Sequence, residues 1–330
     1  MSGKSNVSWQ PSHQESSLMT DFLTYLKVDH GLSFKNYEKL HTWSTMDNAD
    51  FWNLFAKYCN INFAMPPKQT VTMADHILDD EWFPGSTLNF AHHLLKRKDD
   101  QTAIIFREEN GNRLNMSYKE LYESVSKLSS FLRKSGIKKG DVIAAVMTNR
   151  PETVVAMLAA SSIGAVWTSC SPDFGIEGII DRIGQVKPKI LFAVGGYQYG
   201  GKHFDLTENI LSLSKKINSL NQIILVQESP LKEINAIPEI VNFEDCLLND
   251  NDLQFESLPF NHPLFIMYSS GTTGKPKCII HGAGGTLLQH LKEHRLHTNI
   301  KKNDRVFFFT TCGWMMWNWL VSALASEATI

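Results

Sequence analysis

The feature that most constrains the fold is an alternation of short apolar runs with amphipathic stretches across residues 115–226. Each apolar run has the length of a buried strand, and the stretch after it has the apolar spacing of a helix. Short strands separated by helices of this length fold as α/β proteins, with parallel or mixed sheets flanked by helices. The expected strands are Val142–Met147, Ala165–Ser169, Ile190–Val194 and Ile223–Val226.

Local signals mark where two of these helices begin. Ser117 and Glu120 form a capping box ahead of an apolar stripe that ends near Gly136. Pro151 stands where the next helix is expected to start, because proline suits the first helical position. Gly164 is expected to end that helix. The sequence therefore predicts a helix between the first two strands.

Residues 1–85 differ from the rest because aromatic residues occupy their apolar positions. The spacing of these aromatics predicts short amphipathic helices. They are Trp43, Phe51, Trp52, Phe55 and Tyr58. We expect a helical N-terminal extension at 1–85, a first α/β subdomain at 86–250 and the start of a second at 251–330, with residues 228–252 as the connection.

Composition limits the kinds of partner. Of the 330 residues, 43% are hydrophobic and 20% charged, and the formal net charge is -2. A chain without net positive charge binds nucleic acid or an anionic membrane surface poorly, so we expect neither as the main partner. Scattered cysteines without C-x-x-C spacing favour a reducing compartment and small buried thiols. They are Cys59, Cys170, Cys246, Cys278 and Cys312.

Two uncharged stretches, residues 153–172 and 306–326, have the length of a membrane span. The first is expected to divide into a helix and a strand, and the second is interrupted at residues 310–313. Both are therefore interpreted as protein core, since a central turn would leave backbone groups unpaired in lipid. The first 30 residues are polar and lack an apolar h-region, so no secretory signal is expected.

The strongest functional signal is the run Tyr268–Lys277, rich in glycine, hydroxyl and lysine residues. Glycines let the backbone approach an anion closely, while backbone N–H groups, hydroxyls and ammonium groups donate to phosphate oxygens. The run predicts a phosphate-binding loop, although turns recruit the same residue types for backbone reasons. The expected phosphate contacts are Ser269, Ser270, Gly271, Thr272, Thr273, Gly274 and Lys277.

This loop differs from the nucleotide P-loop, because fewer residues separate its first glycine from the Gly-Lys pair. Pro276 disfavours helical backbone at Lys275, so we expect a strand–loop–strand element with Lys275 left in solvent. The first strand is expected at Leu264–Met267. The loop should then lie at the carboxyl ends of the parallel strands, where α/β proteins bind ligands.

Two further runs carry candidate side chains. Residues 311–319 combine Gly313 with three tryptophans; of these, Trp317 and Trp319 are interpreted as core, because large aromatics are usually packing residues. His290, Glu293 and His294 match the H-x-x-E-H pattern of a zinc peptidase, within an expected helix from Gly284 to about His297. Such short matches also arise by chance, so a zinc hydrolase stays as an alternative that metal analysis can test.

The residue order of Tyr268–Lys277 resembles the phosphate loop of the adenylate-forming superfamily, whose members activate carboxylates with ATP. Within that superfamily the chain closely resembles the acetoacetyl-CoA synthetases. The residues that carry this narrower resemblance lie at 278–294, 313–319, Asp173–Gly175 and around Trp43. The resemblance covers nearly the whole chain.

The resemblance implies that ATP and acetoacetate give an acyl-adenylate and pyrophosphate, and that CoA then gives acetoacetyl-CoA and AMP in the cytosol. Mg²⁺ would be held mainly by the triphosphate, so no metal ligand is assigned to the chain. The resemblance also implies an acyl pocket formed by Trp314, Met315 and Met316, in which Trp314 shortens the space for small acids. Lys202 would lie near the 3′-phosphate of CoA.

Members of the family continue beyond the position of Ile330 with the residues that contact adenine, ribose and Mg²⁺, and with a mobile C-terminal domain. The resemblance therefore implies a truncated portion, with its catalytic residues beyond Ile330 and no full reaction of its own. Two alternatives stay open: a non-catalytic nucleotide- or partner-binding fragment, and a ligase for another short-chain acid such as butyrate.

Overall fold

The computed structural model describes residues 16–226, 238–248, 252–269 and 274–330. Its centre is a seven-stranded sheet in the order β12-β11-β8-β6-β7-β14-β15. Neighbouring strands from β12 to β14 run parallel, while β15 is antiparallel to β14. The expected α/β class is confirmed. The strand bounds are β6 (Val142–Val146), β7 (Val166–Cys170), β8 (Ile190–Val194), β11 (Gln222–Val226), β12 (Glu239–Asn242), β14 (Pro263–Ser269) and β15 (Lys277–Gly282).

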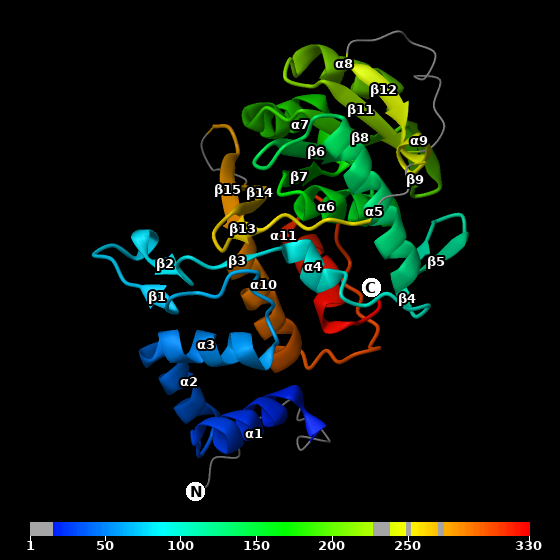
Figure 1. Cartoon of the computed structure of the whole chain (residues 1–330). Helices are drawn as coiled ribbons and strands as arrows, with labels where there is room; N and C mark the ends of the chain where they lie inside the picture. Colours follow the sequence, from blue (N-terminus) through cyan, green and yellow to red (C-terminus); the bar gives the residue numbers. More distant parts are fainter. Residues whose placement is uncertain (1–15, 227–237, 249–251, 270–273) are drawn as a thin grey trace, which may run out of the picture.

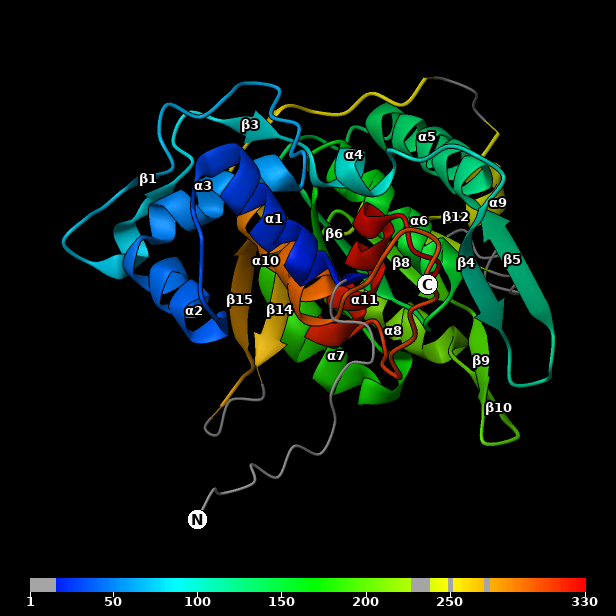
Figure 2. The ribbon, with the colours of Figure 1, turned by 90° about the horizontal axis from the view of Figure 1, so that it is seen from below.

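Helices cover both faces of this sheet. From β6 the chain moves one way to β7, and it then returns past β6 to reach β8. Right-handed crossovers therefore place the helix before β7 on one face and the helices after it on the opposite face. Figures 1 and 2 show α5 and α6 on one side of the sheet and α7 and α8 on the other. Their bounds are α5 (Tyr118–Lys134), α6 (Pro151–Ser162), α7 (Gly175–Ile183) and α8 (Thr207–Lys216).

The predicted helix starts are confirmed. The Ser117 side chain accepts from the backbone N–H of Glu120, and the Glu120 carboxylate accepts from the backbone N–H of Ser117. Pro151 occupies the first turn of α6, and eleven of the twelve residues of α6 are buried. The uncharged stretch 153–172 is thus a buried helix followed by the buried strand β7.

Two short hairpins lie outside the central sheet. The β4–β5 hairpin (Thr102–Arg107 and Arg113–Ser117) and the β9–β10 hairpin (Gly196–Tyr199 and Lys202–Asp205) lie near each other. The smaller elements are β1 (Val71–Thr72), β2 (Glu81–Trp82), β3 (Thr87–Leu88), α4 (Phe90–Leu94), α9 (Phe243–Cys246) and β13 (Leu258–Pro259).

The N-terminal extension is helical, as predicted. It consists of α1 (Leu18–His30), α2 (Tyr37–Met46) and α3 (Asn48–Tyr58), packed around the aromatic residues that the sequence singled out. Phe51 and Phe55 stack at 6.0 Å between ring centroids. The Arg295 guanidinium lies 4.9 Å from the centroid of the Tyr58 ring, which joins this extension to the C-terminal part.

The C-terminal part begins with α10 (Ala283–Lys292), which continues as one π-helical turn (Glu293–His297). After residues 304–314 comes α11 (Met315–Ser322) and a short 3₁₀ turn (Ala323–Ser326). The final residue, Ile330, exchanges backbone hydrogen bonds with Ala103 and Ile105 around β4. Among the described residues, no helix is both long and apolar enough to cross a membrane.

Near the C-terminus, Thr329 and Arg305 form a single parallel bridge. Cys278 is exposed, unlike the other four cysteines, because β15 is the edge strand of the sheet with its middle residues in solvent. The division at residue 250 stays a prediction; strands from both sides of it share one sheet.

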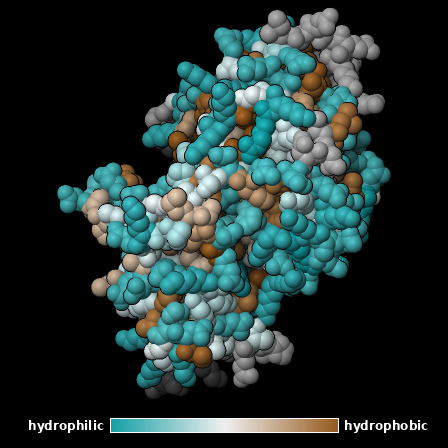
Figure 3. Space-filling model, viewed as in Figure 1, coloured by the Kyte–Doolittle hydropathy of each residue, from teal (hydrophilic) through white to brown (hydrophobic). Residues whose placement is uncertain are grey.

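The surface of the molecule is mostly polar. The face shown in Figure 3 is mainly hydrophilic, with hydrophobic residues in small groups between polar ones. Large exposed apolar side chains gather instead in particular segments, notably β15 and residues 307–315. Such segments mark candidate binding surfaces.

Candidate functional site

The carboxyl ends of the central strands bring together segments that are far apart in the sequence. Residues 147–150 follow β6, residues 171–175 follow β7, and the loop after β14 leaves the sheet at the same edge because β14 is parallel to β7. Ligands of open α/β sheets bind at this edge. The sequence-predicted phosphate loop therefore begins where the fold offers a crevice.

The predicted strand–loop–strand element is confirmed. In the antiparallel β14–β15 pair, Ser269 lies opposite Lys277, so the two ends of the loop are neighbours. Gly274 has φ +97, a conformation that side-chain-bearing residues rarely adopt. Ser269, Gly274 and Lys277 are thus positioned at one loop. The other predicted phosphate contacts, Ser270, Gly271, Thr272 and Thr273, lie outside the described residues.

Helix α7 holds the returning side of this loop. The Lys275 ammonium lies 3.3 Å from a carboxylate oxygen of Asp181. The Gln185 amide, just after α7, donates to the backbone carbonyl of Pro276 at 2.9 Å. Lys275 is exposed, as expected, but it also has an acidic partner. Exposed ion pairs contribute little stability, so the effect of these contacts is to restrict where the loop lies.

The outgoing side of the loop is braced from β7. The Tyr268 hydroxyl lies 2.9 Å from the Thr168 hydroxyl, which also donates to the backbone carbonyl of Ile266. Burial raises the pKa of Tyr268, so its hydroxyl stays protonated and can donate. The strand before the loop is therefore fixed to the centre of the sheet on the side opposite β15.

The second run, residues 311–319, crosses the same edge. The Cys312 carbonyl accepts from the Ser169 hydroxyl at 2.6 Å, and its thiol donates to the Met147 carbonyl at 3.0 Å. A methyl group on Gly313 would lie 3.2 Å from the backbone nitrogen of Ser171, a tight contact. Glycine therefore lets this segment approach the end of β7.

The three tryptophans of this run have different environments. Trp317 is fully buried and donates its ring N–H to Asn149 at 2.9 Å, so its interpretation as core is confirmed. Trp319 packs edge-on against His294, with ring centroids 4.5 Å apart, and it also borders a hollow. Trp314 is 61% exposed.

An open hollow of about 730 Å³ lies beside these elements. Side chains from β15, α10 and α11 line it, and both predicted acyl-pocket methionines, Met315 and Met316, are among them. Trp314 is not among the lining residues. The polar side chains around the hollow include Thr286, Gln289 and His290. A mixed lining of this kind suits a small molecule that has an apolar part and a polar end.

His290 and His294 do not act as a pair of metal ligands in this arrangement. His290 bonds through Nδ1 to the Ser322 hydroxyl at 2.8 Å, while His294 is fully buried against Trp319. Their ring centroids are 6.2 Å apart. Among the described residues, no group of three or more His, Cys, Asp or Glu side chains is placed to hold a metal ion.

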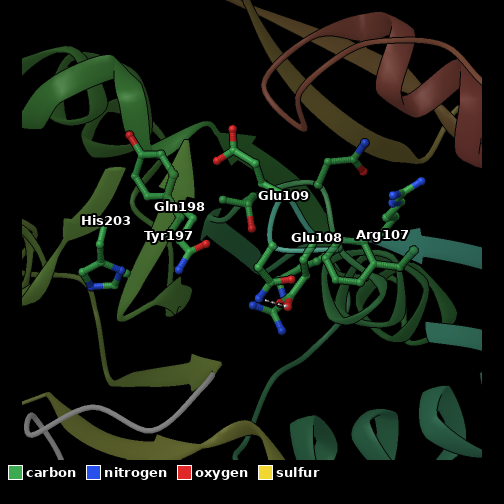
Figure 4. A pocket seen from close by; sticks show the side chains of 12 residues that line it. Arg107, Glu108, Glu109, Tyr197, Gln198 and His203 are labelled. Carbon is green, nitrogen blue, oxygen red and sulfur yellow. Dashed lines mark hydrogen bonds between the residues drawn. The ribbon is translucent and has the colours of Figure 1, made fainter. Parts of the chain in front are cut away.

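A second cavity, of about 410 Å³, lies between the β4–β5 and β9–β10 hairpins. Figure 4 shows Tyr197, Gln198 and His203 on one side and Arg107, Glu108 and Glu109 on the other. The Glu109 carboxylate accepts from the backbone N–H groups of Gly200 and Gly201, at 2.8 and 3.3 Å. Lys202, the predicted CoA contact, is exposed in the same hairpin but does not line the cavity.

Several contacts at these sites had no signal in the sequence. Asp181, Gln185, Glu109 and Ser322 are ordinary surface or helix residues by spacing. Each meets its partner across tens of residues of sequence, so only the folded chain shows the contact.

Comparisons with known proteins agree with this fold. Residues 90–330 match the family model described as "AMP-binding enzyme", and residues 37–94 match "Acetyl-coenzyme A synthetase N-terminus". An acetoacetyl-CoA synthetase from Gallus gallus is 43% identical over 99% of this chain and 51% of its own length. An acetoacetyl-coenzyme A synthetase from Rhizobium meliloti (strain 1021) is 42% identical over 98% of this chain and 50% of its own length.

A solved structure matches as well. That of the acetoacetyl-CoA synthetase from Streptomyces lividans has a TM-score of 0.92 at 36% identity, covering 98% of this chain and 50% of that chain. The chain thus spans about half the length of the relatives it matches. These matches confirm the resemblance that the motifs indicated. Because the first family model covers most of its residues, the chain belongs to the AMP-binding enzyme family.

Proposed function

We propose that this chain is the ATP- and acid-binding portion of a carboxylate–CoA ligase that converts acetoacetate to acetoacetyl-CoA through an acyl-adenylate. The observation that carries the proposal is the β14–β15 hairpin, whose loop joins Ser269 to Lys277 at the carboxyl edge of the sheet, beside a hollow lined by Met315 and Met316. The relatives named acetoacetyl-CoA synthetase support the choice of acid.

In this proposal the hairpin loop binds the β- and γ-phosphates of ATP through hydroxyls, backbone N–H groups and the Lys277 ammonium. Transfer of the adenylyl group of ATP to the carboxylate, with pyrophosphate as the leaving group, needs charge neutralisation and placement of two anions more than it needs a protein nucleophile. Asp181 and Gln185 would keep the loop in place through Lys275 and Pro276.

The hydrogen-bond donors of the predicted phosphate loop indicate how Mg²⁺ would be bound. Serine, threonine, lysine and backbone N–H groups bind phosphate oxygens, whereas Mg²⁺ prefers carboxylate, phosphate and water oxygens. Asp181, whose carboxylate contacts the returning side of the loop, pairs with Lys275. We therefore propose that Mg²⁺ reaches the site with the triphosphate, where it would neutralise phosphate charge.

The acid would occupy the hollow beside β15, with Trp314, Met315 and Met316 at its α11 end. Trp314 is exposed now, so its role in shortening the pocket requires that it turn toward the acid or be covered by further polypeptide. CoA would approach the β9–β10 hairpin, where Lys202 offers a charge. We assign no catalytic residue within this chain; the proposal places them in residues equivalent to the second half of the relatives. Free cysteines fit the proposed cytosolic location.

Isothermal titration calorimetry with Mg·ATP tests the phosphate loop. Lys277→Gln is expected to weaken binding about tenfold or more, since a charge-assisted contact is worth about 1.5–3 kcal/mol. Lys275→Gln is the matched control, two residues away, and should change affinity less than threefold. Equal effects of the two substitutions would contradict the assignment of Lys277.

Acetoacetate-dependent exchange of pyrophosphate into ATP separates the candidate functions. Exchange by a protein that joins this chain to the second half of a relative, but not by the chain alone, would support the ligase portion. ATP binding without exchange in either protein would favour a non-catalytic nucleotide-binding fragment.

A second candidate is a ligase for another short acid. Trp314 does not line the hollow of about 730 Å³, so the size of the hollow does not by itself select acetoacetate over another short acid. Comparing exchange rates for acetate, butyrate and acetoacetate with the joined protein, and then with Trp314→Gly, identifies both the acid and the role of Trp314. The fastest exchange with butyrate would replace acetoacetate as the substrate.

A further inference from the structure

The hollow contains one polar side chain with an unusually well-defined environment, His290 on α10. It is 7% exposed and borders the hollow together with Met315, Met316 and Trp319. Its Nδ1 lies 2.8 Å from the Ser322 hydroxyl oxygen, which in turn lies 2.8 Å from the backbone carbonyl oxygen of Asn318.

These two distances favour one arrangement of the protons. A serine hydroxyl carries one hydrogen; when it donates to the Asn318 carbonyl, its oxygen accepts from Nδ1–H of His290. Burial lowers the pKa of His290 to about 3, with further lowering by nearby His294 and His281. The ring is therefore neutral near pH 7, and Nε2 is an unprotonated acceptor with no hydrogen-bond partner among the described residues.

The same pair can reverse its direction at small cost. The Asn318 carbonyl is in α11, four residues before Ser322, so the helix backbone also donates to it. If the Ser322 hydroxyl turns toward Nδ1, the ring takes its other tautomer and Nε2–H becomes a donor. His290 can thus either accept from or donate to a group in the hollow without taking up charge.

We propose that His290, oriented by Ser322, hydrogen-bonds the 3-oxo group of the acid, and so distinguishes 3-oxo acids from saturated acids of the same length. This inference rests on the proposed function, because it takes the hollow as the acid pocket. With acetoacetate, Nε2–H donates to the ketone oxygen; with butyrate, the same nitrogen faces methylene groups.

The preference for acetoacetate over butyrate depends on whether Nε2 of His290 keeps a hydrogen-bond partner when the acid binds. Butyrate would remove solvent from Nε2 without replacing the hydrogen bond, whereas acetoacetate replaces it. One net hydrogen bond is worth about 0.5–1.5 kcal/mol, and an unsatisfied buried group costs about 1–3 kcal/mol. The expected preference for acetoacetate over butyrate is therefore about tenfold.

The test is NMR on the 330-residue chain with ¹³C-methyl methionine and ¹⁵N-histidine labels, titrated separately with acetoacetate and butyrate in the presence of Mg·ATP. The Met315 and Met316 methyl signals report whether an acid enters the hollow. The ring-nitrogen signals of His290 report its tautomer. Met315→Leu, Met316→Leu and His290→Asn variants assign the signals.

If the inference is right, both acids shift the methionine signals, but acetoacetate alone moves the His290 ring nitrogens to the Nε2–H tautomer. His290→Leu should then lower acetoacetate affinity about tenfold and leave butyrate affinity within twofold, while His290→Gln, which keeps a donor, should restore part of the preference. Ser322→Ala should reduce the preference without abolishing binding.

The failures are distinguishable. If both acids shift the methionine signals and His290 does not respond to acetoacetate, the role of His290 is wrong and the acid pocket stands. If neither acid shifts Met315 or Met316, the pocket assignment fails and the inference fails with it. If His290→Leu weakens both acids equally, the residue is structural and the inference is overturned.

Discussion

The centre of the sheet and its β15 edge are built from similar apolar residues, but these residues are buried in the centre and exposed at the edge. Every residue of β7 and β8 is buried, with helices on both faces. On β15, Ile279 and Ile280 are 48% and 61% exposed, and Phe309, in the segment before α11, is 85% exposed. The apolar residues of the centre have thus found partners within the chain, while those of the edge have not.

This difference in burial means that the centre of the sheet stabilises the fold, whereas the edge offers apolar side chains for binding. Burying a large apolar side chain contributes about 1.5–3 kcal/mol, so the centre supplies most of what holds the fold together. Exposed apolar side chains contribute little to stability. Those of Ile279 and Ile280 line the hollow, on the strand that follows the predicted phosphate loop. The regions that the proposed chemistry uses are therefore those that contribute least to the stability of the fold.

The largest expected effect tests the centre against the edge directly. Phe192→Ala, in β8, should destabilise the chain by about 3–5 kcal/mol, because it removes a fully buried ring and leaves a cavity. Phe309→Ala is the matched control and should change stability by about 0.5 kcal/mol or less. Urea unfolding of both variants measures the comparison; equal losses would mean that Phe309 is buried in solution.

Two adjacent glycines of α10 give the next largest contrast. A methyl group on Gly284 would lie 2.3 Å from the Phe260 ring, so Gly284→Ala should cost about 1–3 kcal/mol. Gly285 has open space around its Cα and borders the hollow, so Gly285→Ala should be neutral or stabilise the helix by up to about 1 kcal/mol. Thermal unfolding of both variants distinguishes the two positions.

Buried histidines make stability depend on pH. Burial lowers the pKa of His93 to about 4, of His290 to about 3 and of His294 to about 4. The unfolded chain binds protons near pH 6.5 and the folded chain does not, so stability is full above that pH and falls below it. At pH 5.5 each histidine should cost about 1.4 kcal/mol.

The loss should level off near the folded pKa values, at about pH 3–4. Urea midpoints at pH 7.5, 6.5 and 5.5 measure the slope. His294→Leu should reduce that slope by the contribution of one histidine, whatever its effect on stability at pH 7.5. An unchanged slope would show that His294 is not buried in a neutral form.

The smallest effect on stability should come from the edge strand itself. Ile280→Lys should change the unfolding free energy by about 0.5 kcal/mol or less, since the side chain is already in solvent. It should still reduce self-association at high protein concentration, because a charge on an edge strand opposes pairing with another chain. Sedimentation velocity of the variant and the unchanged chain tests this expectation.

Elements with strong local signals were predictable. The capping box at Ser117, the proline at the start of α6 and the buried strand β8 depend on short-range backbone and burial preferences, and all are confirmed. The exposure of Cys278 was not predictable, because an apolar run looks the same in the sequence of a central strand and of an edge strand. Strand order decides between them.

The candidate site was predictable only where local residue patterns indicate it. Glycine and hydroxyl residues between two apolar runs identify a loop that can approach phosphate, and Gly313 marks a close approach of backbones. The contacts of Asp181, Gln185 and Glu109 could not be foreseen, since nothing in their neighbourhood indicates a partner so far along the chain.

The sequence by itself determined the class of fold, the loop between two strands at residues 269–277 and the family, because periodicity, turn residues and residue order are local properties. Only the tertiary structure decided which apolar residues stay in solvent, and that Met315, Met316 and His290 face one hollow. It also decided which groups orient the His290 ring, because Ser322 and the Asn318 carbonyl belong to another helix. Contacts between distant segments depend on how the elements pack, which no local pattern records.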